Sequence, residues 1–223
     1  MIKSAIFIPT YKRAENVVTY KTLKDAGYNG QIYLVISDDD NELEKYKKIY
    51  KNKVIVFSKE DIRPFVDMLD NFEKRNCVVY ARNIIFKIAK KLKLDCFCVL
   101  DDDYSAFRFR RIFGDKLRGF KVNNIQSIIE QSYEYLMKTE NLDCFAWSQS
   151  GDFIGGADTY YRINGKRKIM NAFFFKTNNP IRFIGSINED LNASVYEGQR
   201  GRVFFTINDV SIEQKDTQQN KGV

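Results

Sequence analysis

Three consecutive carboxylates, Asp101, Asp102 and Asp103, have the most specific chemistry in this sequence. They directly follow an apolar run, residues 96–100, whose length and charged boundary are typical of a buried strand. Clustered carboxylates repel one another, and a hard cation such as Mg²⁺ or Mn²⁺ relieves that repulsion, usually with phosphate oxygens in its shell. If the strand continues, Asp101 and Asp103 project to one side, whereas Asp102 projects elsewhere or reaches the metal through water. The triplet predicts a metal site, and a solvated acidic turn is the alternative.

Two further polar loops follow predicted strands in the first forty residues. The first is Pro9-Thr10-Tyr11-Lys12-Arg13, in which an aromatic ring and two cations could stack a base and pair with a diphosphate. The second is the run at residues 37–40, where the Asp39 carboxylate could accept hydrogen bonds from a base or a ribose. Each loop taken alone is also consistent with a surface turn.

Two candidate groups lie near predicted helix starts. Arg82 and Asn83 stand near the beginning of a helical pattern, where the guanidinium and free N–H groups could meet a phosphate. Glu189 and Asp190 follow a Gly-Ser turn and could deprotonate an acceptor hydroxyl. The sequence contains no histidine, so proton transfer must fall to Asp, Glu, Lys, Tyr or Cys. The alternatives are a solvated arginine and two acids favoured by a helix dipole.

A basic and aromatic segment follows the triplet, between residues 104 and 121. Its cations could track a phosphate backbone, and its four phenylalanines could stack on an extruded base. The alternative is a basic hairpin whose phenylalanines are core. A second basic turn occupies residues 165–168. The candidate nucleic-acid-binding cations are Arg108, Arg110, Arg111, Lys116, Arg118 and Lys121.

The composition is that of a globular protein of one domain. The chain has 223 residues, 44% of them hydrophobic, and a net charge of +7 that suits a polyanionic partner. No apolar run approaches the roughly 20 residues of a membrane span, and the N-terminus shows no signal core. The four cysteines are expected to be reduced. We therefore expect a cytoplasmic protein with no membrane partner.

Hydrophobic periodicity predicts strands and helices that alternate in the first half. Such alternation indicates βαβ units and a mainly parallel sheet. The predicted strands there are residues 4–8, 31–36, 54–57 and 96–100, and the predicted helices are residues 16–26 and 77–93. In the second half the predicted helices are residues 123–138 and 186–197, and the predicted strands are residues 144–147, 171–175 and 203–207.

The expected fold class is therefore α/β, with a Rossmann-type, mainly parallel central sheet flanked by helices and a smaller mixed region. We expect a single domain over residues 1–223. Residues 1–104 form its nucleotide-binding half, residues 105–213 its acceptor-side half, and residues 214–223 a polar tail.

Taken in order, these motifs resemble those of GT-A glycosyltransferases. More narrowly, residues 8–13, 80–83 and 100–104 resemble the TET-associated glycosyltransferases, a group that includes the base J glucosyltransferase and phage enzymes. The resemblance implies a GT-A fold and transfer of a sugar, expected to be glucose, from a UDP-sugar to the hydroxymethyl group of a modified pyrimidine in double-stranded DNA. If the chain is phage-encoded, its location is the cytoplasm of the infected host.

The resemblance also implies roles for the residues. Asp103, assisted by Asp101, would hold Mn²⁺ or Mg²⁺ against the donor diphosphate. Asp190 or Glu189 would be the base if the enzyme inverts the anomeric centre, whereas a retaining enzyme needs no base there. GT-A enzymes often take a further metal ligand, commonly histidine, from a C-terminal segment; here another residue serves, or the ligand lies outside these 223 residues. The expected donor-binding residues are Pro9, Thr10, Tyr11, Arg13, Asp39, Arg82, Asn83, Asp101 and Asp102.

Three other functions stay open at this point. A nucleotidyltransferase would usually carry a glycine-rich loop after the first strand, and residues 8–11 contain no glycine. A non-enzymatic nucleic-acid-binding module would explain the positive charge but leaves the acid clusters unexplained. A GT-A glycosyltransferase acting on a protein or a polysaccharide is the nearest alternative.

Overall fold

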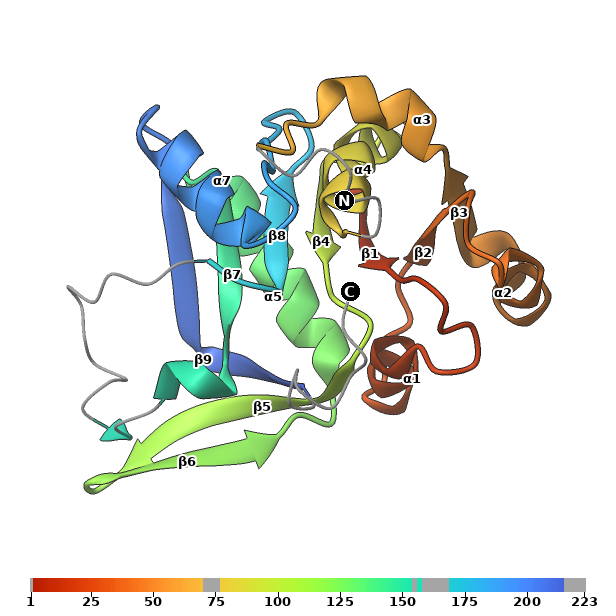
Figure 1. Cartoon of the computed structure of the whole chain (residues 1–223). Coiled ribbons are helices and arrows are strands. Elements are labelled where there is room, and N and C mark those ends of the chain that lie inside the picture. Colours follow the sequence, from red (N-terminus) through yellow and green to blue (C-terminus); the bar gives the residue numbers. More distant parts are fainter. Residues whose placement is uncertain (1, 70–76, 154–155, 158–168, 215–223) are drawn as a thin grey trace.

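A computed structural model describes residues 2–69, 77–153, 156–157 and 169–214 of the chain. In these residues nine strands form one mixed sheet in the order β3-β2-β1-β4-β8-β7-β9-β5-β6 (Figure 1). Helices cover both faces of the sheet, so the α/β class predicted from the sequence is confirmed.

The first four strands are parallel. They are β1 (Ser4–Pro9), β2 (Ile32–Ser37), β3 (Val54–Phe57) and β4 (Cys96–Val99). The connections contain α1 (Val18–Asp25), α2 (Leu43–Tyr50) with the 3₁₀ turn η1 (Lys51–Lys53), α3 (Lys59–Ile62) with η2 (Arg63–Phe65), and α4 (Val79–Lys91). Because the strands are parallel, their carboxyl ends meet at one edge of the sheet, where α/β sheets bind ligands.

The second half is mixed in direction. Its elements are β5 (Tyr104–Phe113), β6 (Lys116–Lys121), α5 (Ile125–Lys138), β7 (Cys144–Gln149), η3 (Ser150–Phe153), β8 (Phe173–Lys176), α7 (Glu189–Gly198) and β9 (Phe204–Gln214). β8 is antiparallel to both β4 and β7, β9 is parallel to β7, and β5 is antiparallel to both β9 and β6.

The predicted helices and strands are all present, with some shifted ends, and four features differ from the prediction. The short helices α2 and α3 and the hairpin of β5 and β6 were not predicted as elements. β9 was expected to end at residue 207 and instead runs to Gln214. In its last part, Val210 and Ile212 face the hydrophobic core, whereas buried Ser211 and half-buried Glu213 bind arginines of β5.

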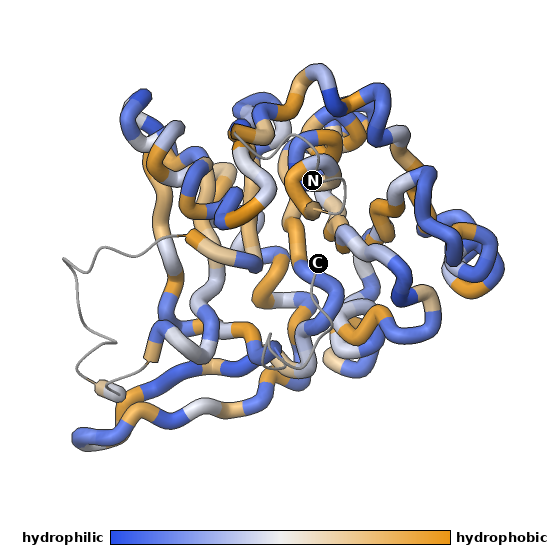
Figure 2. The backbone as a smooth tube through the Cα atoms, viewed as in Figure 1, coloured by the Kyte–Doolittle hydropathy of each residue, from blue (hydrophilic) through white to orange (hydrophobic). Residues whose placement is uncertain are grey.

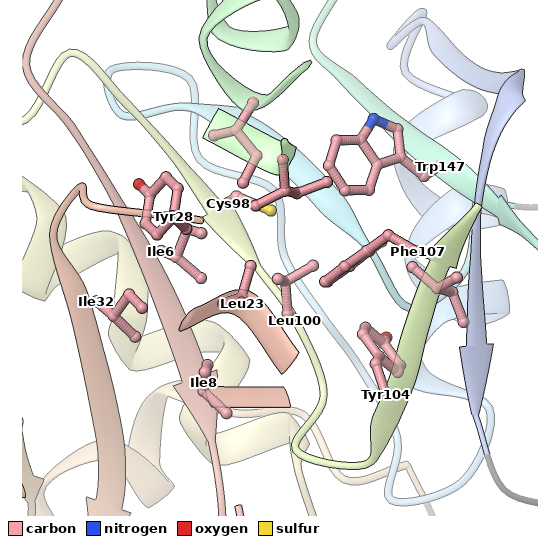
Figure 3. Close-up of a cluster of buried hydrophobic side chains, with 14 of the residues drawn as sticks. Ile6, Ile8, Leu23, Tyr28, Ile32, Cys98, Leu100, Tyr104, Phe107 and Trp147 are labelled. Carbon is pink, nitrogen blue, oxygen red and sulfur yellow. The ribbon is translucent and has the colours of Figure 1, made fainter. Parts of the chain in front are cut away.

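Two hydrophobic cores lie on opposite faces of the sheet. Residues of α1, α2 and α5 pack on one face around Ile6, Cys98 and Trp147 (Figure 3). Residues of α4 pack on the other face around Phe97 and a row of phenylalanines on β8. Figure 2 shows hydrophobic residues along the central strands and long hydrophilic stretches on the hairpin of β5 and β6. Full burial of each large apolar side chain stabilises the fold by about 1.5–3 kcal/mol.

The cysteines agree with the sequence prediction. Cys96 and Cys98 point into the same core, as their spacing on one strand requires. All four cysteines of the chain carry free thiols, and burial raises the thiol pKa of Cys96 to about 12.

Candidate active site

A pocket of about 520 Å³ opens at the carboxyl ends of β1 and β4. Four segments form much of its wall: the loop after β1, the start of α4, the acidic triplet and the start of α7. Residues at the ends of β2 and β3, Lys59, Asn171 and Gln214 form the rest. These segments are far apart in the sequence, and the parallel strands bring them together. The predicted site residues that line this pocket are Pro9, Thr10, Tyr11, Arg13, Arg82, Asp101, Asp102, Asp103, Glu189 and Asp190.

Asp102 is the member of the triplet that points into the protein. Its carboxylate accepts hydrogen bonds from Thr10 Oγ1 at 2.6 Å and from Arg13 Nη1 at 2.7 Å. Burial raises the pKa of the Asp102 carboxyl, and the two hydrogen bonds oppose that shift. Asp102 therefore ties the loop after β1 to the triplet, which leaves its neighbours to face the pocket.

Asp101 connects the triplet to two helices. Its Oδ1 accepts a hydrogen bond from Arg82 Nη2 of α4 at 3.1 Å. Its backbone carbonyl accepts a hydrogen bond from the Thr19 hydroxyl of α1, and that hydroxyl accepts in turn from the backbone N–H of Tyr104 at 2.8 Å. The turn between β4 and β5 is thus fixed on both sides, so the positions of the carboxylates are set by the fold.

Asp103 carries the most perturbed carboxyl of the triplet. Burial, followed by the charges of Asp101 and Asp102, raises its pKa to about 6. The part of this shift that comes from Asp101 and Asp102 reflects negative charge that a bound cation would relieve. Within the described ranges, no three Asp, Glu or Cys side chains are grouped so as to hold a metal ion. Asp103 lines the pocket beside Asp101 and Asp102, at the position that the sequence predicted for a metal ligand.

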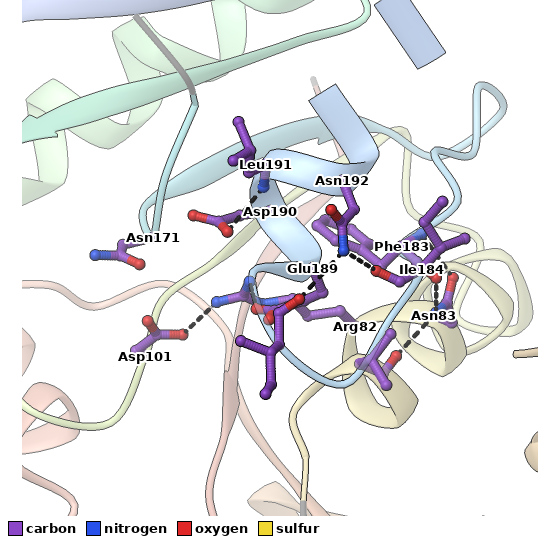
Figure 4. Close-up of polar contacts among 12 residues, drawn as sticks. Arg82, Asn83, Asp101, Asn171, Phe183, Ile184, Glu189, Asp190, Leu191 and Asn192 are labelled. Carbon is purple, nitrogen blue, oxygen red and sulfur yellow. Dashed lines mark hydrogen bonds and ion pairs between the residues drawn. The ribbon is translucent and has the colours of Figure 1, made fainter. Parts of the chain in front are cut away.

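Arg82 is buried between the triplet and α7, with 4% of its surface exposed (Figure 4). One Nη binds Asp101 and the other binds Glu189, while the guanidinium lies 5.0 Å from the Phe173 ring. Burial disfavours the charge, but the two carboxylates outweigh it and raise the pKa of Arg82. The sequence suggested contact with a diphosphate. The structure instead shows both Nη groups bound to protein carboxylates.

Glu189 and Asp190 begin α7 in different environments. The Glu189 carboxylate is bound to Arg82 and is mostly buried. Asp190 Oδ1 accepts a hydrogen bond from the backbone N–H of Leu191 at 2.8 Å, and Asp190 forms no ion pair with a described residue. Of the two acids, Asp190 is the one whose charge is not neutralised by a cation in the described structure.

Asn83 does not line the pocket. Its Nδ2 donates to the backbone carbonyl of Phe183 at 2.9 Å, and its Oδ1 accepts from the Phe183 N–H at 3.1 Å. The side chain thereby fixes the loop that leads into α7. Asn83 was predicted to bind the donor, and its position is that of a supporting residue instead.

Asp39 lines a second pocket of about 340 Å³, adjacent to the first. Burial opposes ionisation of Asp39, but hydrogen bonds from Ser37 and Lys59 outweigh it and lower the pKa of this carboxyl. Lys59 lines both pockets, and its Nζ lies 2.9 Å from Asp39 and 4.8 Å from the centre of the Tyr11 ring. Sequence reasoning missed Lys59, because a single lysine after β3 carries no distinguishing pattern.

The six cations predicted to bind nucleic acid do not share one surface. Arg108 pairs with Glu213, and Arg110 donates to Ser211 Oγ at 2.9 Å, both on β9. Arg111 projects from the other face of the hairpin, as alternation along a strand requires. The four phenylalanines also divide: Phe107 is buried and Phe109 half-buried, as the core alternative required, whereas the two nearest the hairpin tip are exposed. The basic turn at residues 165–168 and the tail after Gln214 lie outside the described residues.

A parallel half joined to a mixed half, with acids at the shared strand edge, is the arrangement of a GT-A-like fold. Solved structures agree with this fold. Glucosyl-3-phosphoglycerate synthase from Mycobacterium tuberculosis in complex with phosphoglyceric acid superimposes with a TM-score of 0.56, at 9% identity, over 96% of this chain and 72% of that one. The same enzyme with Mn²⁺, UDP-glucose and phosphoglyceric acid gives a TM-score of 0.53, at 8% identity, over 98% and 74%.

The chain belongs to the TET-associated glycosyltransferase family, whose model matches residues 4–223. Among curated proteins, none matches the sequence. Family membership makes the chain an enzyme, a glycosyltransferase, and sets aside the non-enzymatic nucleic-acid-binding module. None of the helices in the described residues has the length and apolarity needed to cross a membrane.

Proposed function

We propose that this glycosyltransferase transfers glucose from UDP-glucose to the hydroxymethyl group of a modified pyrimidine in double-stranded DNA, with Mn²⁺ or Mg²⁺ bound. The observation that carries the proposal is the convergence of the loop after β1, the acidic triplet and the start of α7 on one pocket. The family name, TET-associated glycosyltransferase, supports a DNA acceptor, in agreement with the resemblance found in the sequence.

The donor nucleotide is assigned to the side of the pocket nearest β1 and β2. Tyr11 offers a ring for stacking, and Lys59 and Arg13 offer positive charge to phosphates. Asp39, kept ionised by Ser37 and Lys59, is a hydrogen-bond acceptor for the ribose or the base. The structural neighbour that contains UDP-glucose and Mn²⁺ supports this choice of donor.

The oxygen ligands that the pocket offers fit a hard divalent cation. Carboxylate oxygens are the ligands that Mg²⁺ and Mn²⁺ prefer, and Asp103 presents such oxygens where negative charge is concentrated. Asp103 would hold the ion, Asp101 would assist while bound to Arg82, and donor phosphates would complete the shell. When bound, the cation neutralises charge on the departing nucleotide.

Asp190 is assigned to acceptor activation. Its carboxylate lines the pocket and would take the proton from the hydroxymethyl oxygen if the enzyme inverts the anomeric centre. Glu189 acts through Arg82 and fixes the start of α7 relative to the triplet. In a retaining enzyme Asp190 would orient the acceptor instead. A base in duplex DNA would have to leave the stack to reach this site.

A donor and acceptor screen tests the proposal. Purified protein is incubated with UDP-glucose or other UDP-sugars, with Mn²⁺ or with EDTA, and with matched duplexes that contain hydroxymethylated or unmodified pyrimidines. Nucleosides are then analysed by mass spectrometry, and the anomer of the product is determined by NMR. We expect one hexose per modified base only with metal and hydroxymethylated DNA. Absence of transfer to every duplex, with each UDP-sugar and with metal present, would overturn the DNA acceptor.

A further inference from the structure

We propose that one face of the hairpin tip is a contact surface for double-stranded DNA. The tip face consists of Phe113, Phe120, Arg111, Arg118 and Lys116. The proposal rests on the DNA acceptor proposed above, and it assigns this contact to a surface separate from the pocket. It also replaces the prediction that all six cations of the hairpin contact DNA together.

The register of the hairpin defines the tip face. Residues directly opposite each other in an antiparallel pair project on the same side. The opposed residues are Phe109 with Phe120, Arg111 with Arg118, and Phe113 with Lys116. Side chains of the alternate positions, which include Arg108, Arg110 and Lys121, therefore project on the other side.

The two faces differ in how their cations are used. On the other face, Arg108 and Arg110 contact Glu213 and Ser211 of β9. On the tip face, Arg111 forms an exposed ion pair with Asp209, whereas Arg118 and Lys116 form no ion pair with any residue in the described ranges. Positive charge on the tip face is thus available to an external partner, whereas the two arginines of the other face are already engaged within the sheet.

Two exposed phenylalanines lie among the cations of the tip face. Phe113 and Phe120 are 53% and 45% exposed, and their ring centres lie 5.6 Å apart in an edge-to-face contact. The Arg118 guanidinium lies 5.8 Å from the centre of the Phe113 ring. Both rings remain in water in this structure, so their burial against a partner would be favourable.

Charge and shape favour duplex DNA as that partner. The hairpin is a two-stranded ribbon that projects from the body of the molecule (Figure 1), and such a ribbon fits the major groove of B-DNA. Cations beside the groove pair with phosphates, and apolar side chains can enter a base step. A neutral protein surface would bury the rings but would leave Arg118 and Lys116 without partners.

Three variants measured by fluorescence anisotropy test the tip face, with a labelled unmodified duplex and no sugar donor. Phe113→Ser/Phe120→Ser should weaken binding about tenfold and leave the salt dependence unchanged. Lys116→Ala/Arg118→Ala should reduce the slope of log K against log salt by about 2, because two phosphate contacts are lost. The matched control is Phe205→Ser on β9, since Phe205 is 49% exposed and lies away from the hairpin. Circular dichroism verifies the fold of each variant.

The outcomes separate this proposal from the proposed function. Wild-type affinity and slope in both double variants, or equal losses in Phe205→Ser, would overturn the tip face even where sugar transfer to hydroxymethylated DNA is observed. Losses confined to the two tip variants support it even where the screen shows no transfer to DNA. Preference for single-stranded over duplex DNA in wild type would also overturn it.

Discussion

The pocket and the hairpin contain similar numbers of charged residues and use them in opposite ways. In the pocket, Arg82 is buried and neutralised by two carboxylates, and Asp102 is neutralised by Arg13. In the hairpin, Arg111 and its partner Asp209 are 57% and 51% exposed. A buried charge network fixes geometry, and its disruption is costly. An exposed set of charges contributes little to stability and remains available to a partner. In the pocket, function therefore depends on the fixed positions of the charged groups. In the hairpin, it depends on the exposure of the charged groups to a partner.

Removal of the Asp103 carboxylate should give the largest effect on activity. Asp103→Asn should reduce sugar transfer by about 10³-fold, because it removes the charge that would hold the cation. The control is Asp25→Asn, an exposed acid at the end of α1, which should retain wild-type activity. Initial rates with UDP-glucose and saturating Mn²⁺ test this, and a fully active Asp103→Asn would contradict the metal assignment.

Loss of the buried cation should cost the most stability. Arg82→Met leaves Asp101 and Glu189 without their partner and should lower the free energy of unfolding by about 3–5 kcal/mol. Adding Glu189→Gln to Arg82→Met should recover part of that loss. Urea denaturation measures both variants, and equal stabilities of wild type and Arg82→Met would show that the network is not structural.

The pH dependence of stability should reveal the charge at Asp103. Its folded pKa of about 6 lies above the value of roughly 3.9 expected in the unfolded chain. Between these values the folded protein binds more protons than the unfolded protein, so ionisation of Asp103 lowers stability as pH rises from about 4 to 6. Metal-free Asp103→Asn should melt at a higher temperature than wild type at pH 7.5, and the gap should close near pH 4. Melting temperatures in EDTA measure the gap, and a gap independent of pH would contradict the raised pKa.

The smallest effect is expected in the hairpin. Arg111→Ala removes an exposed ion pair with Asp209 and should change the free energy of unfolding by about 0–1 kcal/mol. The same denaturation experiment applies, with Arg82→Met as the internal comparison. A loss of 3 kcal/mol or more in Arg111→Ala would remove the contrast between the two regions.

Much of the fold was accessible from periodicity. β3 was predicted with its observed ends, and the long helices α4 and α5 were predicted to within two residues. The last part of β9 was not predicted, and the cause is physical. Polar residues on one of its faces bind arginines of β5, and in the sequence such residues cannot be told from those of a solvent-exposed face. The hairpin was considered only as an alternative, since its exposed phenylalanines and paired arginines follow no simple alternation of apolar and polar residues.

The sequence by itself determined the chemistry that is available: three adjacent carboxylates after a buried strand, cations in the loop after the first strand, no histidine, and a resemblance that the family match confirms. Only the tertiary structure decided which of these groups pair with one another. Local sequence sets residue types and strand direction, but pairing depends on side chains that approach from distant elements. Asp102 faces Arg13 and Asp101 faces Arg82, and these contacts with distant elements fix the triplet at the wall of the pocket.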